Sequence, residues 1–250
     1  MEIGEARLAF TTDSYVVHPL FFPGGDIGKL AVCGTVNDLA MCGATPRYLS
    51  VGMIIEEGFS RTDLEKVTAS MQATAENAGV QLVTGDIGRH GLSILAAREG
   101  LKFETEILSD CGLLNGAVKR LLDAKIELHC LRDLTRGGLA TALKEIAADS
   151  GIGIRITERD ILVSEEVRGA AELLGLDPLY VANEGRMIAI VPAEQVGPAL
   201  SALRHKPITA ASAVIGTVGK PGNGRLVMET MMGANRVLDL LSGEQLPRIC

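Results

Sequence analysis

The sequence predicts an α/β or α+β fold, and three observations support that class. Short runs rich in β-branched and aromatic residues alternate along the chain with longer segments whose apolar residues recur at helical spacing. Hydrophobic residues make up 47% of the 250 residues, which is enough to bury a substantial core. Aromatic residues account for only 3% and Trp is absent, so the core has to be aliphatic.

Five elements are expected in the first third of the chain. Residues 7–17 and 47–57 contain β-branched and aromatic residues in the pattern of strands. Between them, residues 26–42 place small and apolar residues at helical spacing, which predicts a mostly buried helix. A second helix is expected at residues 62–77 and a short strand at residues 80–84.

The second of these helices has the clearest end signals. Thr62 is expected to cap its N-terminus, and Glu65, three residues later, completes a capping box. Gly79 is expected to end the helix as a left-handed residue.

The second half of the chain repeats the alternation. Helices are expected at residues 113–124, 139–149, 164–175 and 193–204. Strands are expected at residues 128–131, 152–156, 187–191, 213–218 and 225–229.

A domain boundary is expected near residues 87–91. We therefore divide the chain into an N-terminal domain of residues 1–88 and a C-terminal α/β domain of residues 89–241. Residues 242–250 lack periodicity and are expected to form a tail.

Composition excludes several classes of function. The net charge is −7, from 24 basic and 31 acidic residues, and no Lys/Arg block is present, which argues against a nucleic-acid-binding protein. No apolar run is long enough to cross a bilayer, so no membrane span is expected. The five cysteines are widely spaced and form no C-x-x-C pair, which argues against zinc and disulfide frameworks and indicates a reducing, cytoplasmic compartment. Four of them are expected to be small buried apolar residues: Cys33, Cys42, Cys111 and Cys130.

Several carboxylates are candidates for binding a cation. Asp13 lies in a predicted strand, Asn37 and Asp38 lie in an apolar helix, and Asp86 follows Gly85 at a strand end. Oxygen ligands on separate elements suit Mg²⁺, which usually takes one or two carboxylates and phosphate oxygens. The alternative is that Asp13 and Asp86 are turn residues and Asp38 is partly exposed, and the residues alone favour that alternative.

Two polar turns are further candidates, although the Walker, nucleophile-elbow, zinc-protease and dinucleotide motifs are absent. Residues 133–138 read D-L-T-R-G-G before a predicted helix, either as an anion-binding N-terminus or as a plain strand-to-helix turn. Asn183, Glu184 and Gly185 form a polar turn before a strand, which alone indicates little.

The C-terminal residue is Cys250, at the end of a nine-residue tail that could reach about 30 Å when extended. It is not a prenylation box, because that motif has its Cys four residues from the end. A thiol on such a tail is either a swinging reactive group or an accidental terminal Cys, and the residues alone do not decide between these two.

Together these segments resemble the HypE family of carbamoyl dehydratases. The resemblance covers most of the chain: it runs from FTTDSYVVHPLFFPGGDIGKLAVCGTVNDLAMCGATPRYLS through VTGD, RDLTRGGLATALKE and VANEG to the terminal PRIC. The wider superfamily includes aminoimidazole ribonucleotide synthetase, selenophosphate synthetase and thiamine-monophosphate kinase. Its members share the N-D pair and the D-x-T-x-G-G segment but not the terminal Cys.

The resemblance implies two α/β domains, a homodimer that pairs N-domain strands, and MgATP bound between the domains. It implies that Asp13, Asp38 and Asp86 serve Mg²⁺ and the phosphates, with Asn37 beside them. Cys250 would accept a carbamoyl group from the carbamoyltransferase HypF. ATP-dependent dehydration would turn this group into a thiocyanate, and Glu184 is a candidate base. The cyanide would pass to iron on the HypC–HypD scaffold for a [NiFe]-hydrogenase.

The sequence departs from the family pattern in two places. A Gly-rich segment that precedes the first strand in the family is missing, and the chain starts at Met1, almost at that strand. The family also continues after VTGD with Thr-Lys and tens of further residues, whereas here Asp86 runs directly into Ile87. Loss of that stretch would remove a strand and a phosphate-binding Lys. Two alternatives therefore stay open: an ATP-incompetent, HypE-like docking protein, and another synthetase of the superfamily.

Overall fold

The structure is a computed structural model that describes residues 2–3, 6–7, 9–47, 49–77, 85–204, 211–221 and 224–241. It contains helices and strands in alternation, as the sequence predicts. Within the described ranges, no helix is both long and apolar enough to cross a membrane.

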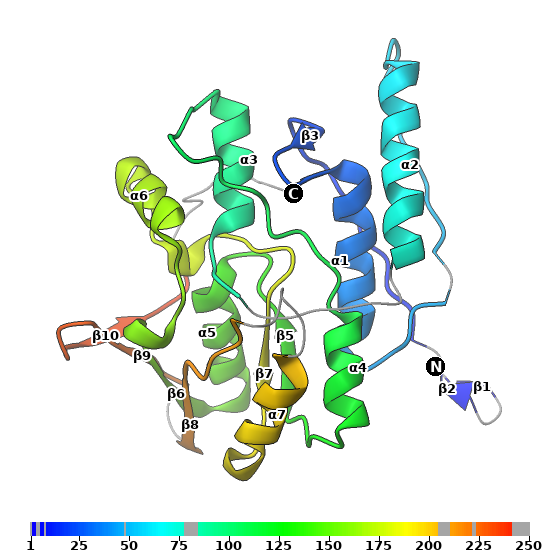
Figure 1. Cartoon of the computed structure of the whole chain (residues 1–250). Coiled ribbons are helices and arrows are strands. Elements are labelled where there is room, and N and C mark those ends of the chain that lie inside the picture. The colour runs from blue at the N-terminus through cyan, green and yellow to red at the C-terminus, as the bar shows by residue number, and fades with distance from the viewer. Residues whose placement is uncertain are drawn as a thin grey trace.

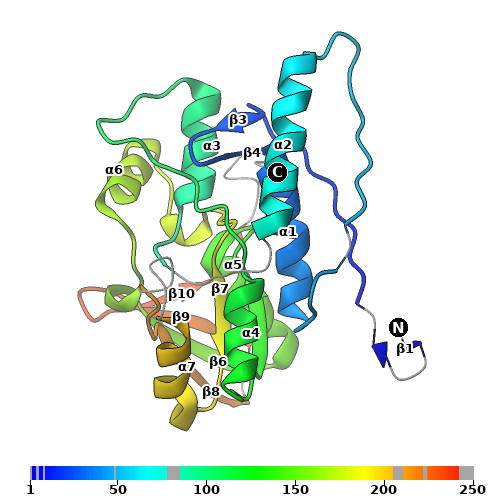
Figure 2. The same cartoon turned by 45° about the vertical axis from the view of Figure 1, so that its right-hand side comes forward.

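Helix α1, Ile27–Met41, lies at the centre of the structure and confirms the helix predicted at residues 26–42. The carboxylate of Asp26 caps it by accepting hydrogen bonds from the backbone N–H groups of Gly28 at 2.7 Å and Lys29 at 3.1 Å. The helix contacts α2, α4 and β5, so it is covered on several sides (Figures 1 and 2). Enclosure of this kind explains why its apolar residues do not form a single stripe.

Helix α2, Arg61–Asn77, confirms the helix predicted at residues 62–77, but the predicted capping box is wrong. Ser60 caps the helix, because its hydroxyl accepts a hydrogen bond from the N–H of Asp63 at 3.3 Å. Glu65 does not reach back to a cap, since Arg61 binds its carboxylate at 2.9 Å. Gly79 and the strand predicted at residues 80–84 lie outside the described residues.

The second half of the chain contains two sets of strands. Strand β5, Cys130–Asp133, pairs antiparallel with β7, Met187–Ile190. A separate four-stranded sheet has the order β10-β9-β6-β8. Its strands are β6 (Ile152–Thr157), β8 (Gly216–Pro221), β9 (Leu226–Glu229) and β10 (Asn235–Leu238). Only the pairing of β6 with β9 is parallel in this sheet. Two further two-residue pairs are β1 (Glu2–Ile3) with β2 (Ala6–Arg7), and β3 (Phe21–Phe22) with β4 (Gly25–Asp26).

Five helices pack around these strands. They are α3 (Arg89–Glu99), α4 (Asn115–Asp123), α5 (Gly138–Ser150), α6 (Glu165–Leu174) and α7 (Val196–Leu203). Single 3₁₀ turns lie at Glu158–Asp160, Pro178–Tyr180 and Ala193–Gln195. Helix α5 packs its Leu139 and Leu143 against Ile154 and Ile156 of β6 to form the largest aliphatic cluster.

Most predicted elements of the second half are confirmed, with shifts of up to three residues at their ends. Helix α3 and strand β10 were not predicted. Helix α3 buries residues on several sides, His90 to Ile94, and so lacks a one-sided apolar stripe. Strand β10 is a sheet edge with three exposed residues, so its pattern resembles a loop.

The strands predicted at residues 7–17 and 47–57 are wrong as assigned. Arg7 belongs to the short strand β2. In the described structure, neither 9–17 nor 49–57 forms part of a strand. Residues 9–17 nevertheless keep the period of a strand, because Val17 is buried while Phe10 and Val16 are 88% and 77% exposed. A ladder needs a second strand, and the described part of the chain provides none for either segment.

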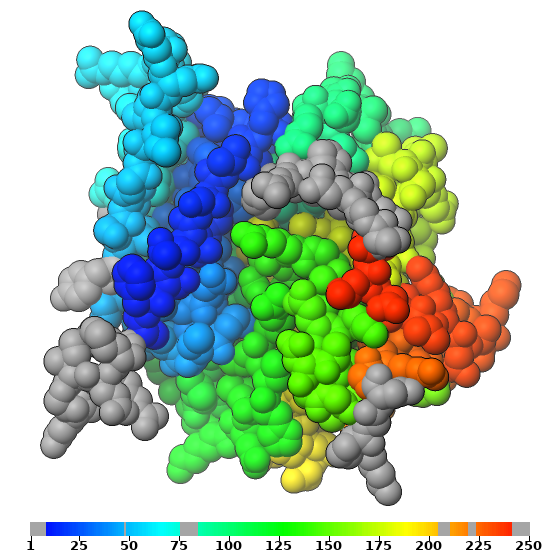
Figure 3. Space-filling model, turned by 180° about the vertical axis from the view of Figure 1, so that it is seen from behind, coloured from blue at the N-terminus to red at the C-terminus, as the bar shows by residue number. Residues whose placement is uncertain are grey.

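The segment 49–57 carries an unusual amount of exposed apolar surface. Ile54 is fully exposed, and Val51, Met53 and Ile55 are about half exposed. Figure 3 shows this cyan segment and the dark-blue segment 9–17 on the surface of the molecule. Within the described residues, this apolar surface is left uncovered.

Two neighbouring leucines on α4 test the packing directly. Leu121 is completely buried where α4 packs against α1 and α7, whereas Leu122 is 45% exposed. We expect Leu121→Ala to lower the free energy of unfolding by about 2 to 5 kcal/mol, because it leaves a cavity. Leu122→Ala, the matched control, should change it by about 0.5 kcal/mol or less. Urea unfolding of both variants measures the difference, and equal losses would contradict the packing described here.

Candidate functional site

The extended segment 9–17 is attached to one face of α1 by polar side chains. The hydroxyl of Thr11 donates to Asp38 Oδ2 at 3.5 Å, and the Tyr15 hydroxyl lies 3.3 Å from Thr35 Oγ1. Asp13, between them, lies close enough to Asp38 to raise the pKa of that carboxyl. Two of the predicted site residues, Asp13 and Asp38, are therefore side by side.

The Asp13–Asp38 pair is electrostatically unfavourable when both carboxyls are ionised. The pKa of Asp38 is raised to about 6, mainly by burial and then by the neighbouring Asp13 carboxyl. Asp133 contributes a smaller increase to the same pKa. A cation between the two carboxylates would relieve this repulsion. The pair therefore offers two of the oxygen ligands that a Mg²⁺ site needs.

Glu184 belongs to the same electrostatic neighbourhood. Burial raises the pKa of Tyr15, and the negative charges of Asp13, Glu184 and Asp38 add to that increase. Glu184 itself is buried in the turn before β7. The charges of the predicted base and of the two predicted ligands thus all act on one tyrosine.

Asn37 lies on the other side of α1 and is 1% exposed. Its amide donates to Gly112 O at 3.0 Å and to Glu184 O at 3.3 Å, and accepts from the N–H of Leu114 at 2.7 Å. Both amide hydrogens are therefore used inside the protein. The structure shows Asn37 as a link between α1 and the Glu184 turn, and its position beside the phosphates stays a prediction.

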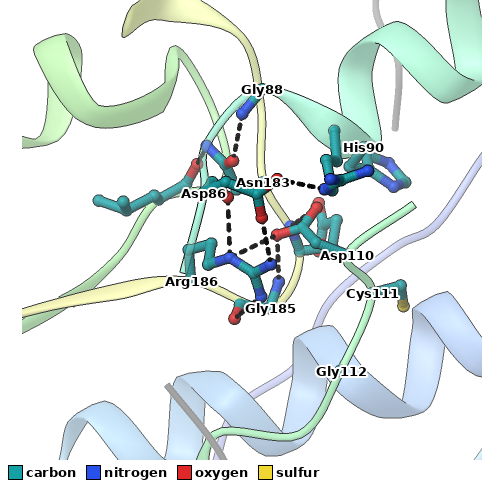
Figure 4. A network of polar contacts seen from close by, with 12 residues as sticks. Asp86, Gly88, His90, Asp110, Cys111, Gly112, Asn183, Gly185 and Arg186 are labelled. Atoms are coloured by element: carbon teal, nitrogen blue, oxygen red, sulfur yellow. Dashed lines mark hydrogen bonds and ion pairs between the residues drawn. The ribbon is translucent and has the colours of Figure 1, made fainter. Parts of the chain in front are cut away.

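A buried ionic network holds the main chain of the Glu184 turn (Figure 4). The Asp110 carboxylate accepts hydrogen bonds from the N–H groups of Glu184 at 3.4 Å and Gly185 at 3.2 Å. The Nε atom of Arg186 lies 3.8 Å from Asp110 Oδ2. A Cβ atom on residue 185 would lie 2.0 Å from Asp110 O, so only glycine fits this position.

Asp86, the third predicted metal ligand, belongs to this network. Arg186 donates from Nη2 to Asp86 Oδ1 at 3.1 Å and from Nε to Asp86 O at 2.9 Å. Arg89 binds the other carboxylate oxygen and also Glu166, at 2.7 Å. The structure does not bring Asp86 together with Asp13 and Asp38, because two arginines already neutralise it. Among the described residues, no group of three or more Asp, Glu, His or Cys side chains converges on a metal position.

His90, at the start of α3, contacts the segment that carries Asp110. It is completely buried, and burial lowers its pKa to about 3, so the imidazole is neutral. Its Nδ1 atom lies 2.9 Å from Ser109 Oγ, which also accepts a hydrogen bond from the N–H of Cys111 at 3.1 Å. The segment that carries Asp110 is thereby fixed to α3.

The turn before α5 favours the packing alternative over the anion-binding one. A Cβ atom on residue 138 would lie 2.6 Å from Val181 O and 2.8 Å from Leu179 O. The first residue of the helix is thus pressed against main-chain carbonyl groups, which would repel an anion. Asp133, just before this turn, is buried, and burial raises its pKa.

The cysteines divide into different environments. Cys33 and Cys111 are buried, as expected for small apolar residues, whereas Cys42 is exposed and Cys130 is half-buried. The prediction of burial is therefore wrong for Cys42. Cys250 lies outside the described residues.

A cavity of about 690 Å³ lies between the β5–β7 pair, the four-stranded sheet and α7. Its lining is mostly aliphatic, and no predicted site residue within the described ranges lines it. It offers few polar groups for a nucleotide and lies apart from the carboxylates.

Sequence reasoning missed Asp110 and Arg186. Each carried a signal: Asp110 is an acidic residue inside the otherwise apolar segment 107–114, and Arg186 directly follows the Asn-Glu-Gly turn. Their pairing spans 76 positions of sequence and so could not be deduced from spacing alone.

Comparisons with known proteins define the class. Residues 1–97 match the family described as "AIR synthase related protein, N-terminal domain", and residues 80–229 match "AIR synthase related protein, C-terminal domain". The two-domain fold is therefore that of the AIR synthase-related proteins.

Within that class the chain belongs to the HypE family. It is 47% identical to the carbamoyl dehydratase HypE of Azotobacter vinelandii, over 100% of this chain and 86% of the relative. A crystal structure of HypE in complex with ATP superimposes with a TM-score of 0.89 at 41% identity, covering 99% of this chain and 90% of that one. A HypE–HypF complex superimposes with a TM-score of 0.84 at 37% identity, covering 91% of this chain and 88% of that one.

The comparison also bears on the expected missing segment. The alignment with the Azotobacter protein spans 293 positions, against 250 residues here, a difference of 43 positions. The relative thus carries a substantial number of residues that have no counterpart in this chain. That difference confirms that this chain is shorter within the aligned region.

The raised pKa of Asp38 predicts that Asp38→Asn increases the free energy of unfolding, by an amount that depends on pH. Between about pH 4 and pH 6 the folded chain keeps a proton that the unfolded chain has released, so this carboxyl lowers stability as the pH rises through that window. We expect Asp38→Asn to be more stable than the native chain at pH 7 by about 1 kcal/mol, a value reduced for solvent screening of this partly exposed group. The gain should disappear near pH 4.

Urea unfolding at several pH values measures this difference. Asp123→Asn is the matched control, because Asp123 is exposed and paired with Lys119 at 2.6 Å. It should show no gain at pH 7. A destabilised Asp38→Asn at pH 7 would show that Asp38 is held as a favourable charge.

Proposed function

We propose that this chain dehydrates a carbamoyl group on the Cys250 thiol to a thiocyanate at the expense of ATP. The observation that carries the proposal is the 47% identity, over the whole chain, to a protein named carbamoyl dehydratase HypE. The shared electrostatic neighbourhood of Asp13, Asp38 and Glu184 supports it, because phosphoryl transfer needs cation ligands and the dehydration needs a base.

The chemistry can be written with every atom balanced. The carbonyl oxygen of the S-carbamoyl group attacks the γ-phosphorus of ATP, ADP leaves, and one N–H proton is lost. The second N–H proton is then removed while the C–O bond breaks, which releases inorganic phosphate and leaves S–C≡N. The net reaction removes one water from the carbamoyl group and consumes one ATP.

Asp13 and Asp38 are the residues that would hold Mg²⁺. Their proximity and the raised pKa of Asp38 fit a site with two carboxylates, in which phosphate oxygens complete the coordination. When bound, the ion would neutralise charge on the transferring phosphoryl group. Asp86 is left out of this set, since its carboxylate is bound by Arg89 and Arg186.

Glu184 is the candidate base for the two N–H protons. It lies at a turn whose main chain is fixed from both sides, and its charge acts on the same tyrosine as the Asp13–Asp38 pair. A fixed carboxylate in a buried site is suited to proton removal.

The proposed place of the reaction is the cytoplasmic assembly of a metal centre. A HypF-type carbamoyltransferase would load the thiol, as the HypE–HypF complex of a relative suggests. The product would supply the cyanide ligand for the iron of a [NiFe]-hydrogenase through a HypC–HypD scaffold.

A second candidate function is a HypE-like docking protein that does not turn over ATP. It is favoured by the 43 aligned positions that have no counterpart here and by the engagement of Asp86 with arginines. Such a protein would bind the carbamoyltransferase without releasing phosphate.

A third proposal concerns assembly: two copies of the chain pair through the segments 9–17 and 49–57. Both segments are extended, carry exposed apolar side chains, and have no ladder partner in the described structure. A second copy would supply strands of the same composition.

Phosphate release from carbamoylated protein tests the reaction. Cyanate converts accessible thiols to S-carbamoyl groups, and we expect the treated native chain to release phosphate from MgATP and to lose the mass of one water. Cys250→Ala is the matched control, since it keeps the exposed Cys42. Release should fall to background in this variant and by about 100-fold or more in Glu184→Gln.

The outcomes separate the candidates. Phosphate release that persists in Cys250→Ala would sink the dehydratase proposal. A native chain that binds a HypF-type protein but releases no phosphate would establish the docking function. Turnover of a purine intermediate would identify another synthetase of the superfamily.

Sedimentation equilibrium tests the assembly. The chain has a mass of 26.3 kDa, and we expect a species of twice that mass. Ile54→Asp should weaken the dimer by about 10-fold or more, because it places a charge in the covered surface. Met232→Asp is the control, since Met232 is 97% exposed on the turn between β9 and β10. A native monomer at high concentration would contradict the proposal.

A further inference from the structure

Asp110 is a completely buried carboxylate that the proposed chemistry does not use. Its two oxygens accept hydrogen bonds from the N–H groups of Glu184 and Gly185, at 3.4 and 3.2 Å. It therefore binds the main chain on both sides of the Glu184 carbonyl. A buried charge is costly to maintain, so a carboxylate placed only to fill space would be unfavourable.

The other polar group of the same residue is held from the opposite side. Glu184 O accepts hydrogen bonds from the N–H of Gly112 at 3.3 Å and from the amide of Asn37 at 3.3 Å. The N–H and the carbonyl of Glu184 are thus both bound. These contacts fix the Cα–Cβ direction of Glu184 and so limit the positions that its carboxylate can reach.

Little space is left for the turn to shift. The main chain of residues 110–112 lies directly against Gly185, where a Cβ atom would be 2.0 Å from Asp110 O and 3.0 Å from Gly112 N. Movement of Asp110 would therefore move the turn with it. Figure 4 shows the Asp110 carboxylate next to Gly185 and Arg186, with dashed lines to both.

Arg186 supplies the counter-charge. Its Nε atom is 3.8 Å from Asp110 Oδ2, and it also donates to the carboxylate and the main-chain carbonyl of Asp86. Burial raises the pKa of Asp110, and Arg186 and the two N–H groups offset part of that increase. Arg186 thereby connects the Glu184 turn to Asp86, which lies just before α3.

We propose that Asp110, with Arg186 as its counter-ion, is the positioning residue that holds Glu184 in place for proton removal. The proposal rests on the dehydratase function proposed above. Asp110 does not touch the substrate in this scheme; it acts through the main chain of Glu184. Its loss should affect the rate of the chemical step more than the binding of ATP, because Asp13 and Asp38 remain in place.

Asp110→Asn tests this role with a change of a single polar group. The asparagine oxygen can accept one of the two N–H groups, but its amide then turns a donor towards the other. We expect kcat for phosphate release by the carbamoylated chain to fall by about 10- to 100-fold, with KM for ATP changed by about threefold or less. Amide hydrogen exchange of Glu184 and Gly185 should become at least about 10-fold faster.

Asp177→Asn is the matched control. Asp177 also accepts a main-chain N–H, that of Leu179 at 3.0 Å, and also pairs with an arginine, Arg236 at 2.7 Å. It therefore makes the same kinds of contact away from the Glu184 turn. The control should leave kcat and the exchange of Glu184 and Gly185 within about twofold of the native values.

Unchanged exchange at Glu184 and Gly185 in Asp110→Asn would overturn the proposal, whatever the activity. Faster exchange with unchanged kcat would overturn it as well, because Asp110 would then hold the turn without serving the reaction. Faster exchange with reduced kcat and an unchanged KM would support it. A native chain that releases no phosphate would refute the proposed reaction separately, and the exchange measurement would still decide whether Asp110 holds Glu184.

Two substitutions of Arg186 cover the case in which Asp110→Asn does not fold. Arg186→Lys keeps a cation near Asp110, and Arg186→Met removes it with similar length. We expect the lysine variant to retain kcat within about 10-fold and the methionine variant to lose about 100-fold. Equal activity of the two variants would show that the counter-charge is not needed.

Discussion

The burial of α1 is the constraint on which the rest of the structure depends. A helix enclosed on several sides has to satisfy its polar side chains within the protein, since water cannot reach them. Asn37 meets this requirement with three contacts, to Gly112, Leu114 and Glu184, all of them main-chain groups of distant segments. A single amide therefore places the loop before α4 and the turn before β7 at fixed positions along α1. On its opposite face, α1 orders the segment 9–17 through Thr35 and Asp38.

Local signals were enough to predict most of the helices. The cap at Asp26 and the left-handed Gly175 at the end of α6 are properties of a few consecutive residues, so they can be read from the sequence. Prediction failed where the deciding partner is remote. Residues 9–17 and 49–57 have the composition of strands, yet a strand exists only when a second one pairs with it. Helix α3 was missed for a related reason, because its surroundings on several sides remove the one-sided stripe.

The candidate site divides in the same way. The family resemblance implied a shared role for Asp13 and Asp38, and the structure places Asp13 close enough to raise the pKa of Asp38. The same reasoning could not reveal that Asp86 is bound by Arg186, a residue 100 positions away. It also could not reveal the contact between Asp110 and Glu184 across 74 positions. Pairings of this length depend on the complete fold, and a search for motifs within short windows does not detect them.

The exposed segments 9–17 and 49–57 also bear on the rate at which the proposed dimer would form. Packing of α1 against its neighbours is a first-order process, whose rate does not depend on how much protein is present. In the dimer proposed above, covering the segment around Ile54 by another chain would be second-order, so its half-time would grow as the protein becomes more dilute. During that interval each chain would present exposed apolar residues and unpaired backbone groups, to which unrelated strands can also add. The rate of synthesis in a cell would therefore affect the yield of the proposed dimer, even when every chain folds equally well.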